Sequence, residues 1–144
     1  MEEEKPTYLS DEIGKFILRL AVAGLLLPHG IQKIINSNMV TDIGGMLKAN
    51  GLPEFLAYGV YVGEVAAPVL ILLGFLTRPA ALIVMINMGM AVWLGHSQDL
   101  LNITADWTHY FKIELAAFFF LGSLALLFFG AGRISVMRGK GALN

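Results

Sequence analysis

PAALIVMINMGMAVWLGHSQ, residues 79–98, is the stretch that decides the fold of this chain. It lies between Arg78 and Asp99 and contains no Asp, Glu, Lys or Arg. An uncharged, mostly apolar run of about 18 residues or more predicts a helix that crosses a membrane. A second uncharged run lies between Glu114 and Arg133, so at least two membrane-spanning helices are expected.

The composition of the whole chain agrees with that prediction. Of 144 residues, 56% are hydrophobic and only 15% are charged, whereas soluble domains carry about a quarter charged residues. The net charge is -1 and the Lys and Arg residues are scattered, so the chain offers no basic surface for nucleic acid. The absence of cysteine excludes thiol catalysis, Cys-ligated iron–sulfur clusters and disulfides.

Two further apolar runs, each interrupted by one or two charges, complete an all-α bundle of four transmembrane helices. The expected spans are about 13–35, 54–76, 79–95 and 111–129. A polar segment at 1–12 precedes them, a polar loop at 96–110 separates the last two, and a basic tail at 137–144 follows. Residues 1–4 are acidic where a cleaved signal peptide is basic, so the first span is expected to stay as an anchor.

The distribution of Lys and Arg predicts the orientation of the bundle. With four spans, both termini and the 77–79 turn share one side of the membrane. That side carries six basic residues and the other side three: Lys5, Lys15, Arg78, Arg133, Arg138 and Lys140 against Lys33, Lys48 and Lys112. Because cytoplasmic segments carry the excess of basic residues, both termini are expected in the cytoplasm.

Ionisable residues inside the spans are the candidates for a functional site. A charge at the centre of a bilayer costs roughly 3 kcal/mol or more, so such residues are paired or functional. The candidates are Arg19, His29, Gln32 and Lys33 in the first span, Glu64 in the second and Glu114 at the start of the fourth. His29 and Glu64 are the two that could carry protons in catalysis, because both can titrate in a perturbed environment.

Helical geometry brings several of these residues to one face. Lys33 points within about 40° of Arg19, and His29 stacks one turn before Lys33. The opposite face, with Leu18, Val22 and Leu25, is expected to meet lipid. Pro28 frees the carbonyl of residue 24 and is expected to bend the helix.

Each candidate also has a purely structural interpretation. Lys33 and Arg19 could reach to the membrane interfaces, and Glu114 could pair with Lys112 or Lys33. Glu64 has no neutralising neighbour in sequence, so it pairs with Arg19, Lys33 or His29, or is protonated. His96 is interpreted as a loop histidine, and the methionines of the third span as core residues. No metal site is predicted.

The ordered set of motifs resembles the DoxX family of small bacterial membrane proteins. The resemblance is carried by Arg19-Leu20, His29-Gly30-Ile31-Gln32-Lys33, Gly51-Leu52-Pro53, Glu64, Leu73-Gly74-Phe75-Leu76-Thr77-Arg78, Glu114 and Gly130-Ala131-Gly132-Arg133-Ile134-Ser135. It extends over about 13–136, with Val136-Met137 departing from the family's usual ending. The resemblance implies a four-helix domain in the bacterial inner membrane. The family takes its name from a subunit of a thiosulfate:quinone oxidoreductase.

Three functions follow from this pattern. The first is a subunit or accessory of quinone-linked redox metabolism, in which the polar residues bind a quinone and a redox partner protein supplies electrons. The second is a small transporter or proton-coupled, channel-like protein. The third is a non-catalytic membrane anchor for a soluble redox enzyme. The sequence also leaves open whether the protein forms a homo-oligomer and whether it binds a small hydrophobic ligand other than quinone.

Overall fold

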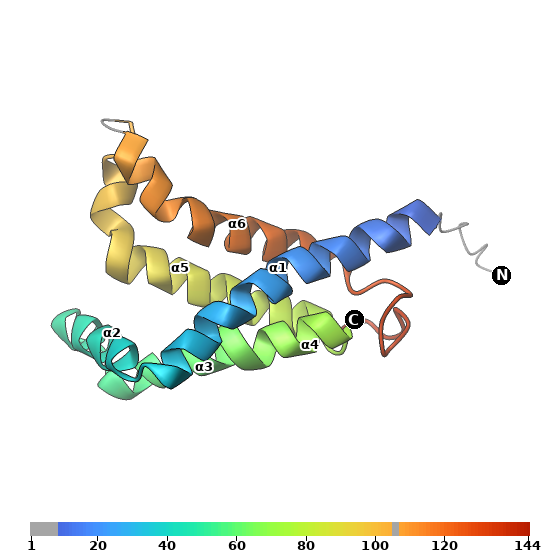
Figure 1. Cartoon of the computed structure of the whole chain (residues 1–144), viewed down its shortest axis with the longest axis horizontal. Helices are drawn as coiled ribbons and strands as arrows, with labels where there is room; N and C mark the ends of the chain where they lie inside the picture. The colour runs from blue at the N-terminus through green and yellow to red at the C-terminus, as the bar shows by residue number, and fades with distance from the viewer. Residues whose placement is uncertain (1–8, 105–106) are drawn as a thin grey trace.

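The computed structural model describes residues 9–104 and 107–144 (Figure 1). The first span is α1 (Leu9–Ile35), and α2 (Asn38–Ala49) follows it. The second span joins four helical pieces, η1 (Glu54–Tyr58), α3 (Gly59–Tyr61), η2 (Val62–Ala66) and α4 (Ala67–Leu73). The third and fourth spans are α5 (Thr77–Leu101) and α6 (Trp107–Phe129). The all-α prediction with four helices long and apolar enough to cross a membrane is confirmed.

The helices form an elongated bundle with two distinct ends. α5 and α6 lie side by side as an antiparallel pair, and α1 crosses both α6 and α4 (Figure 1). The start of α1, the turn before α5 and residues 130–144 gather at one end, here called the terminal end (Figure 1). α2 and the last turns of α5 lie at the opposite end, the far end.

Small residues allow the helices to pack closely. The core contains Ala23, Ala67, Ala80 and Ala81, each at most 1% exposed, around larger residues such as Leu26 and Phe119. Membrane helices use small residues at their contacts, because lipid tails are as apolar as leucine and close van der Waals packing decides association. Large apolar side chains such as Leu121 and Phe128 instead point outward, as expected of a surface that faces lipid.

The lipid-facing side predicted for α1 is partly wrong. Leu25 is 58% exposed, but Val22 is completely buried. The buried face runs through Arg19, Val22, Ala23, Leu26 and Gly30. Both α4 and α6 cover α1, so the buried stripe is wider than the polar residues alone indicated. α1 also continues unbroken through Pro28.

Several predicted boundaries differ from the structure. The second span ends at Leu73, because Gly74 has φ +68° and stops the helix in the left-handed region. The third continues to Leu101 past a break at His96, whose φ is -135°. The fourth begins at Trp107. Of the polar segment predicted at 1–12, residues 1–8 lie outside the described part, and α1 already begins at Leu9.

Residues 137–144 are not a free tail. The backbone N–H of Arg78 donates to the carbonyl of Leu143 at 3.2 Å, and the Thr77 hydroxyl donates to the Asn144 side-chain oxygen at 3.1 Å. Asn144 is only 4% exposed. The C-terminal residues therefore fold back onto the start of α5. A basic composition alone cannot reveal this contact, because it depends on backbone groups.

Candidate functional site

The central feature of the bundle is a buried polar centre made of Lys33, Glu64 and Asn87. The Lys33 ammonium forms an ion pair with one carboxylate oxygen of Glu64. The other oxygen accepts a hydrogen bond from the Asn87 side-chain amide at 3.1 Å. The side chain of Glu64 is 4% exposed and that of Lys33 is 18% exposed. The polar centre thus joins the first three spans through one carboxylate.

The backbone around Glu64 is locally wound as a π-helix, η2. Pro68 lies four residues after Glu64 and has no N–H, so it cannot donate the regular helical bond to the Glu64 carbonyl. The amide of Ala67 instead bonds the carbonyl of Val62, five residues earlier. Single π-helical turns of this kind occur frequently at functional sites. The local sequence therefore places Glu64 on an irregular turn.

Glycines bring the neighbouring helices against this turn. A Cβ on Gly30 would collide with the Glu64 carbonyl and would lie 2.6 Å from a methyl of Val65. A Cβ on Gly63 would lie 2.6 Å from the Cβ of Asn87. The polar centre is therefore level with the last two turns of α1, and its ion pair depends on a close backbone approach that only glycine permits.

We expect Gly30→Ala to destabilise the protein by about 1–3 kcal/mol, because the added methyl must push α1 away from η2. The effect is measurable as a loss of unfolding free energy in mixed detergent micelles. Gly45→Ala is a matched control, because a Cβ at Gly45 has no neighbour within 4 Å. Equal stability of the two variants would contradict the close approach.

His29 does not join the polar centre. Its side chain is exposed on α1, one turn before Lys33, and its ring meets Phe119 edge to face with centroids 6.0 Å apart. It makes no hydrogen bond with any other described residue. Gln32 is likewise exposed on α1. The structure therefore leaves an imidazole on the outer surface of a span, next to the buried ion pair.

Arg19 lies at the terminal end and holds backbone rather than a carboxylate. It is 2% exposed and donates to the carbonyls of Ile71, Leu72, Ala131 and Ile134. The first two carbonyls belong to the last turn of α4, where regular helical bonding ends; the Ile71 carbonyl also accepts the Gly74 N–H at 3.0 Å. Arg19 therefore links α1 to the end of α4 and to the C-terminal segment. The structure separates it from Lys33 and Glu64.

Glu114 is exposed on α6 and makes no ion pair with another described residue. The pairing expected with Lys112 or Lys33 does not form, because Lys112 contacts Asp99 at 3.0 Å and Lys33 contacts Glu64.

The structure also shows groupings that the sequence did not predict. The Asp99 carboxylate lies 3.0 Å from Nδ1 of His96 and 2.7 Å from Nδ1 of His109, and it also pairs with the Lys112 ammonium. This cluster ties the end of α5 to the start of α6. The sequence did not predict this cluster, because residues 96–110 were expected to form a loop rather than the end of one helix and the start of the next. Asn87 was not predicted as a site residue, although a polar amide in an otherwise apolar, uncharged run was the available signal.

An apolar cavity of about 630 Å³ lies between α5 and α6. Trp93, Leu101, Ile113 and Phe120 are among the residues that line it. The polar centre and His29 lie outside this lining. Among the described residues no group of three or more His, Asp or Glu is arranged to hold a metal ion.

The comparisons with known proteins identify the family. A scan against protein-family models matches the DoxX family over residues 14–97. Neither the search of curated proteins nor the search of solved structures found a match. The matched range contains Arg19, His29, Gln32, Lys33 and Glu64, while Glu114 and the 130–135 motif lie beyond it. The match extends over more than half of the chain, which therefore belongs to the DoxX family of membrane proteins.

Proposed function

We propose that this protein is a membrane subunit or accessory of quinone-linked redox metabolism and that His29 contacts the quinone head group. We also propose that it lies in the bacterial inner membrane with both termini in the cytoplasm. The observation that carries the proposal is the exposed imidazole beside the buried polar centre. A polar ring on the outside of a membrane span is costly unless something binds it.

Quinone chemistry suits this position. A quinone diffuses within the bilayer and carries two carbonyl oxygens, which accept hydrogen bonds. Its reduction to a quinol consumes two electrons and two protons. His29 can donate a hydrogen bond to a ring oxygen of the quinone. The electrons come from a redox partner protein, as the family's relation to a thiosulfate:quinone oxidoreductase implies.

The polar centre lies next to His29 and is expected to support the same quinone chemistry. Lys33 lies one helical turn from His29 on α1, and its partner Glu64 is nearly completely buried. Lys33 is positioned to favour negative charge that develops on the head group. Glu64 and Asn87 hold Lys33 in place, since they bind it to the second and third spans. The exposed Gln32 is a further candidate for hydrogen bonding to the ligand.

We expect purified wild-type protein to retain quinone after mild detergent extraction and His29→Phe to lose most of it, because phenylalanine keeps the contact with Phe119 but has no hydrogen-bonding group. Chromatography of organic extracts measures the quinone. Trp93→Leu, in the separate cavity between α5 and α6, is the matched control and is expected to retain quinone. Absence of quinone from both wild type and Glu64→Gln would overturn the proposal.

A further inference from the structure

A second cavity lies at the terminal end, far from the polar centre along α1. It has a volume of about 660 Å³ and is enclosed by the first turns of α1, the start of α5, the end of α6 and the C-terminal segment. Five cationic side chains and one carboxylate contribute to its lining: Lys15, Arg78, Arg133, Arg138 and Lys140, with Glu12. The cavity is therefore strongly basic in a chain whose net charge is -1.

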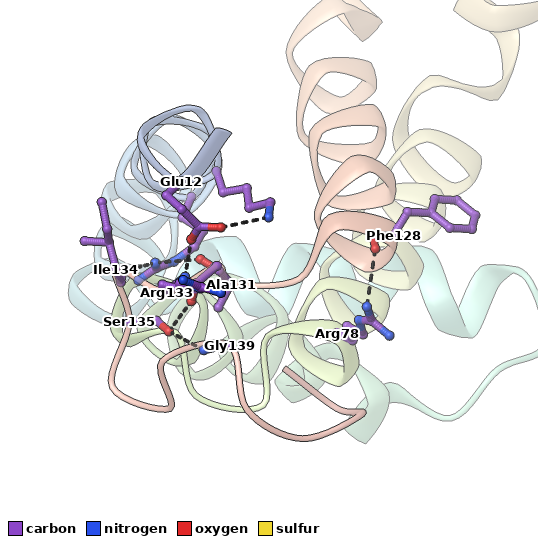
Figure 2. Close-up of polar contacts among 11 residues, drawn as sticks. Glu12, Arg78, Phe128, Ala131, Arg133, Ile134, Ser135 and Gly139 are labelled. Carbon is purple, nitrogen blue, oxygen red and sulfur yellow. Dashed lines mark hydrogen bonds and ion pairs between the residues drawn. The ribbon is translucent and has the colours of Figure 1, made fainter. Parts of the chain in front are cut away.

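The single carboxylate is already occupied. One oxygen of Glu12 contacts the Lys15 ammonium at 3.2 Å, and the other accepts the backbone N–H of Arg133 (Figure 2). The side chains of Arg78, Arg133, Arg138 and Lys140 form no ion pair with any carboxylate in the described part of the chain. Four cationic side chains around one cavity thus lack a side-chain carboxylate as a partner.

Two buried donors beside the cavity also lack an acceptor. Arg78 donates through its terminal nitrogens to the carbonyls of Ala142 at 3.2 Å and Phe128 at 3.4 Å, the latter drawn in Figure 2. Its Nε has no partner among the described residues, and neither has the side-chain nitrogen of Asn144, which is 4% exposed. A buried donor without an acceptor destabilises the folded state, so an acceptor at this position would stabilise the protein.

The C-terminal backbone shapes the cavity. Gly132, Gly139 and Gly141 line it with φ values of +76°, +68° and +89°. The Ser135 hydroxyl accepts the Gly139 N–H at 3.2 Å and donates to the Gly132 carbonyl at 2.6 Å (Figure 2). These bonds fix the loop that carries Arg133, Arg138 and Lys140. The cations are therefore held around the cavity by an ordered backbone.

We propose that this cavity binds a phosphate group and that the phosphate belongs to the headgroup of an anionic lipid. Phosphate supplies several acceptor oxygens, which suits guanidinium groups and unpaired N–H donors. The lipid assignment follows from the surroundings: Phe129 lines the cavity, and Phe128 and Val136 are 72% and 67% exposed beside it. Apolar side chains among cations mark the level where acyl chains meet headgroups.

The test uses the full chain in detergent and native mass spectrometry to titrate phosphatidylglycerol. The Arg138→Gln/Lys140→Gln variant removes two exposed cations whose side chains form no hydrogen bond or ion pair with other described residues. Each cation near anionic lipid contributes about 1 kcal/mol, so we expect roughly a thirtyfold rise in the dissociation constant. Lys48→Gln/Lys112→Gln, which removes two charges at the far end, is expected to bind as wild type does.

Four further measurements complete the design. Arg138→Lys/Lys140→Arg is expected to restore binding, which separates charge from folding, and melting temperatures report on folding directly. Zwitterionic phosphatidylcholine is expected to bind weakly to all variants. Titration with inorganic phosphate by calorimetry tests whether the cavity binds free phosphate instead of a lipid headgroup. Tight binding of inorganic phosphate without a preference for phosphatidylglycerol would overturn the lipid assignment. Equal phosphatidylglycerol affinity in wild type and Arg138→Gln/Lys140→Gln would overturn the site itself.

Discussion

Arg19→Met is expected to destabilise the protein by at least about 3 kcal/mol. The change removes the donors for four backbone carbonyls on two segments, at Ile71, Leu72, Ala131 and Ile134. Hydrogen bonds from a charged group contribute about 1.5–3 kcal/mol each, and acceptors left buried without partners lose more. Unfolding in mixed detergent micelles, followed by circular dichroism, measures the difference.

The comparison with Arg19→Lys makes this result specific. A lysine keeps the charge but has one nitrogen instead of the guanidinium fork, so it cannot reach α4 and the C-terminal segment together. We therefore expect Arg19→Lys to recover less than half of the lost stability. Leu20→Met, at a neighbouring position that is 53% exposed, is the control and is expected to have little effect. A mild phenotype for Arg19→Met would contradict the structural role of this residue.

Lys33→Met is expected to have the second large effect. It leaves the carboxylate of Glu64, whose side chain is 4% exposed, with only Asn87 as a partner. Breaking a buried ion pair by removing one member costs about 3–5 kcal/mol. Glu64→Gln is expected to cost less, because Lys33 lies near the end of α1 and its long side chain can turn towards water. The same unfolding measurement in detergent compares both variants.

The double variant Lys33→Met/Glu64→Gln distinguishes a pair from two independent residues. It contains no unpaired buried charge, so we expect it to be more stable than Lys33→Met alone. Lys48→Met provides the contrast, since it breaks an ion pair with Glu54 at 2.8 Å whose members are 75% and 57% exposed. That variant is expected to show no measurable loss. Strict additivity of the two single changes would contradict a direct contact between Lys33 and Glu64.

The sequence was informative wherever one physical effect dominated. Long apolar runs, two of them uncharged, predicted the four spans, because a bilayer disfavours charge and imposes a minimum helix length. The isolation of Glu64 in its span required a partner or a proton, and Lys33 was among the three partners considered. The proximity of both chain ends also followed from an even number of spans, and the contact between Glu12 and the Arg133 backbone agrees with it.

The sequence was less informative where two effects competed. Arg19 was grouped with the site because its spacing matched Lys33, yet the carbonyls of Ile71 and Leu72 in the last turn of α4 bind it at the terminal end. His29 was one of the three partners considered for Glu64, but Gly30 makes the close contact with the Glu64 backbone and the imidazole is exposed. The last turns of α5, after His96, were expected to be a loop because their composition is polar, and the sequence alone does not show that they pack against α6. These outcomes depend on neighbouring helices, which periodicity within one span does not describe.

The position of the quinone tests the account most directly. Wild-type protein in native membranes would be labelled with an azidoquinone, and mass spectrometry of its peptides would locate the adduct. The account predicts labelling on α1 around His29 and on the facing turn of α6 around Phe119, with strong reduction in His29→Phe. Labelling confined to the cavity between α5 and α6, or equal labelling of wild type and His29→Phe, would contradict it.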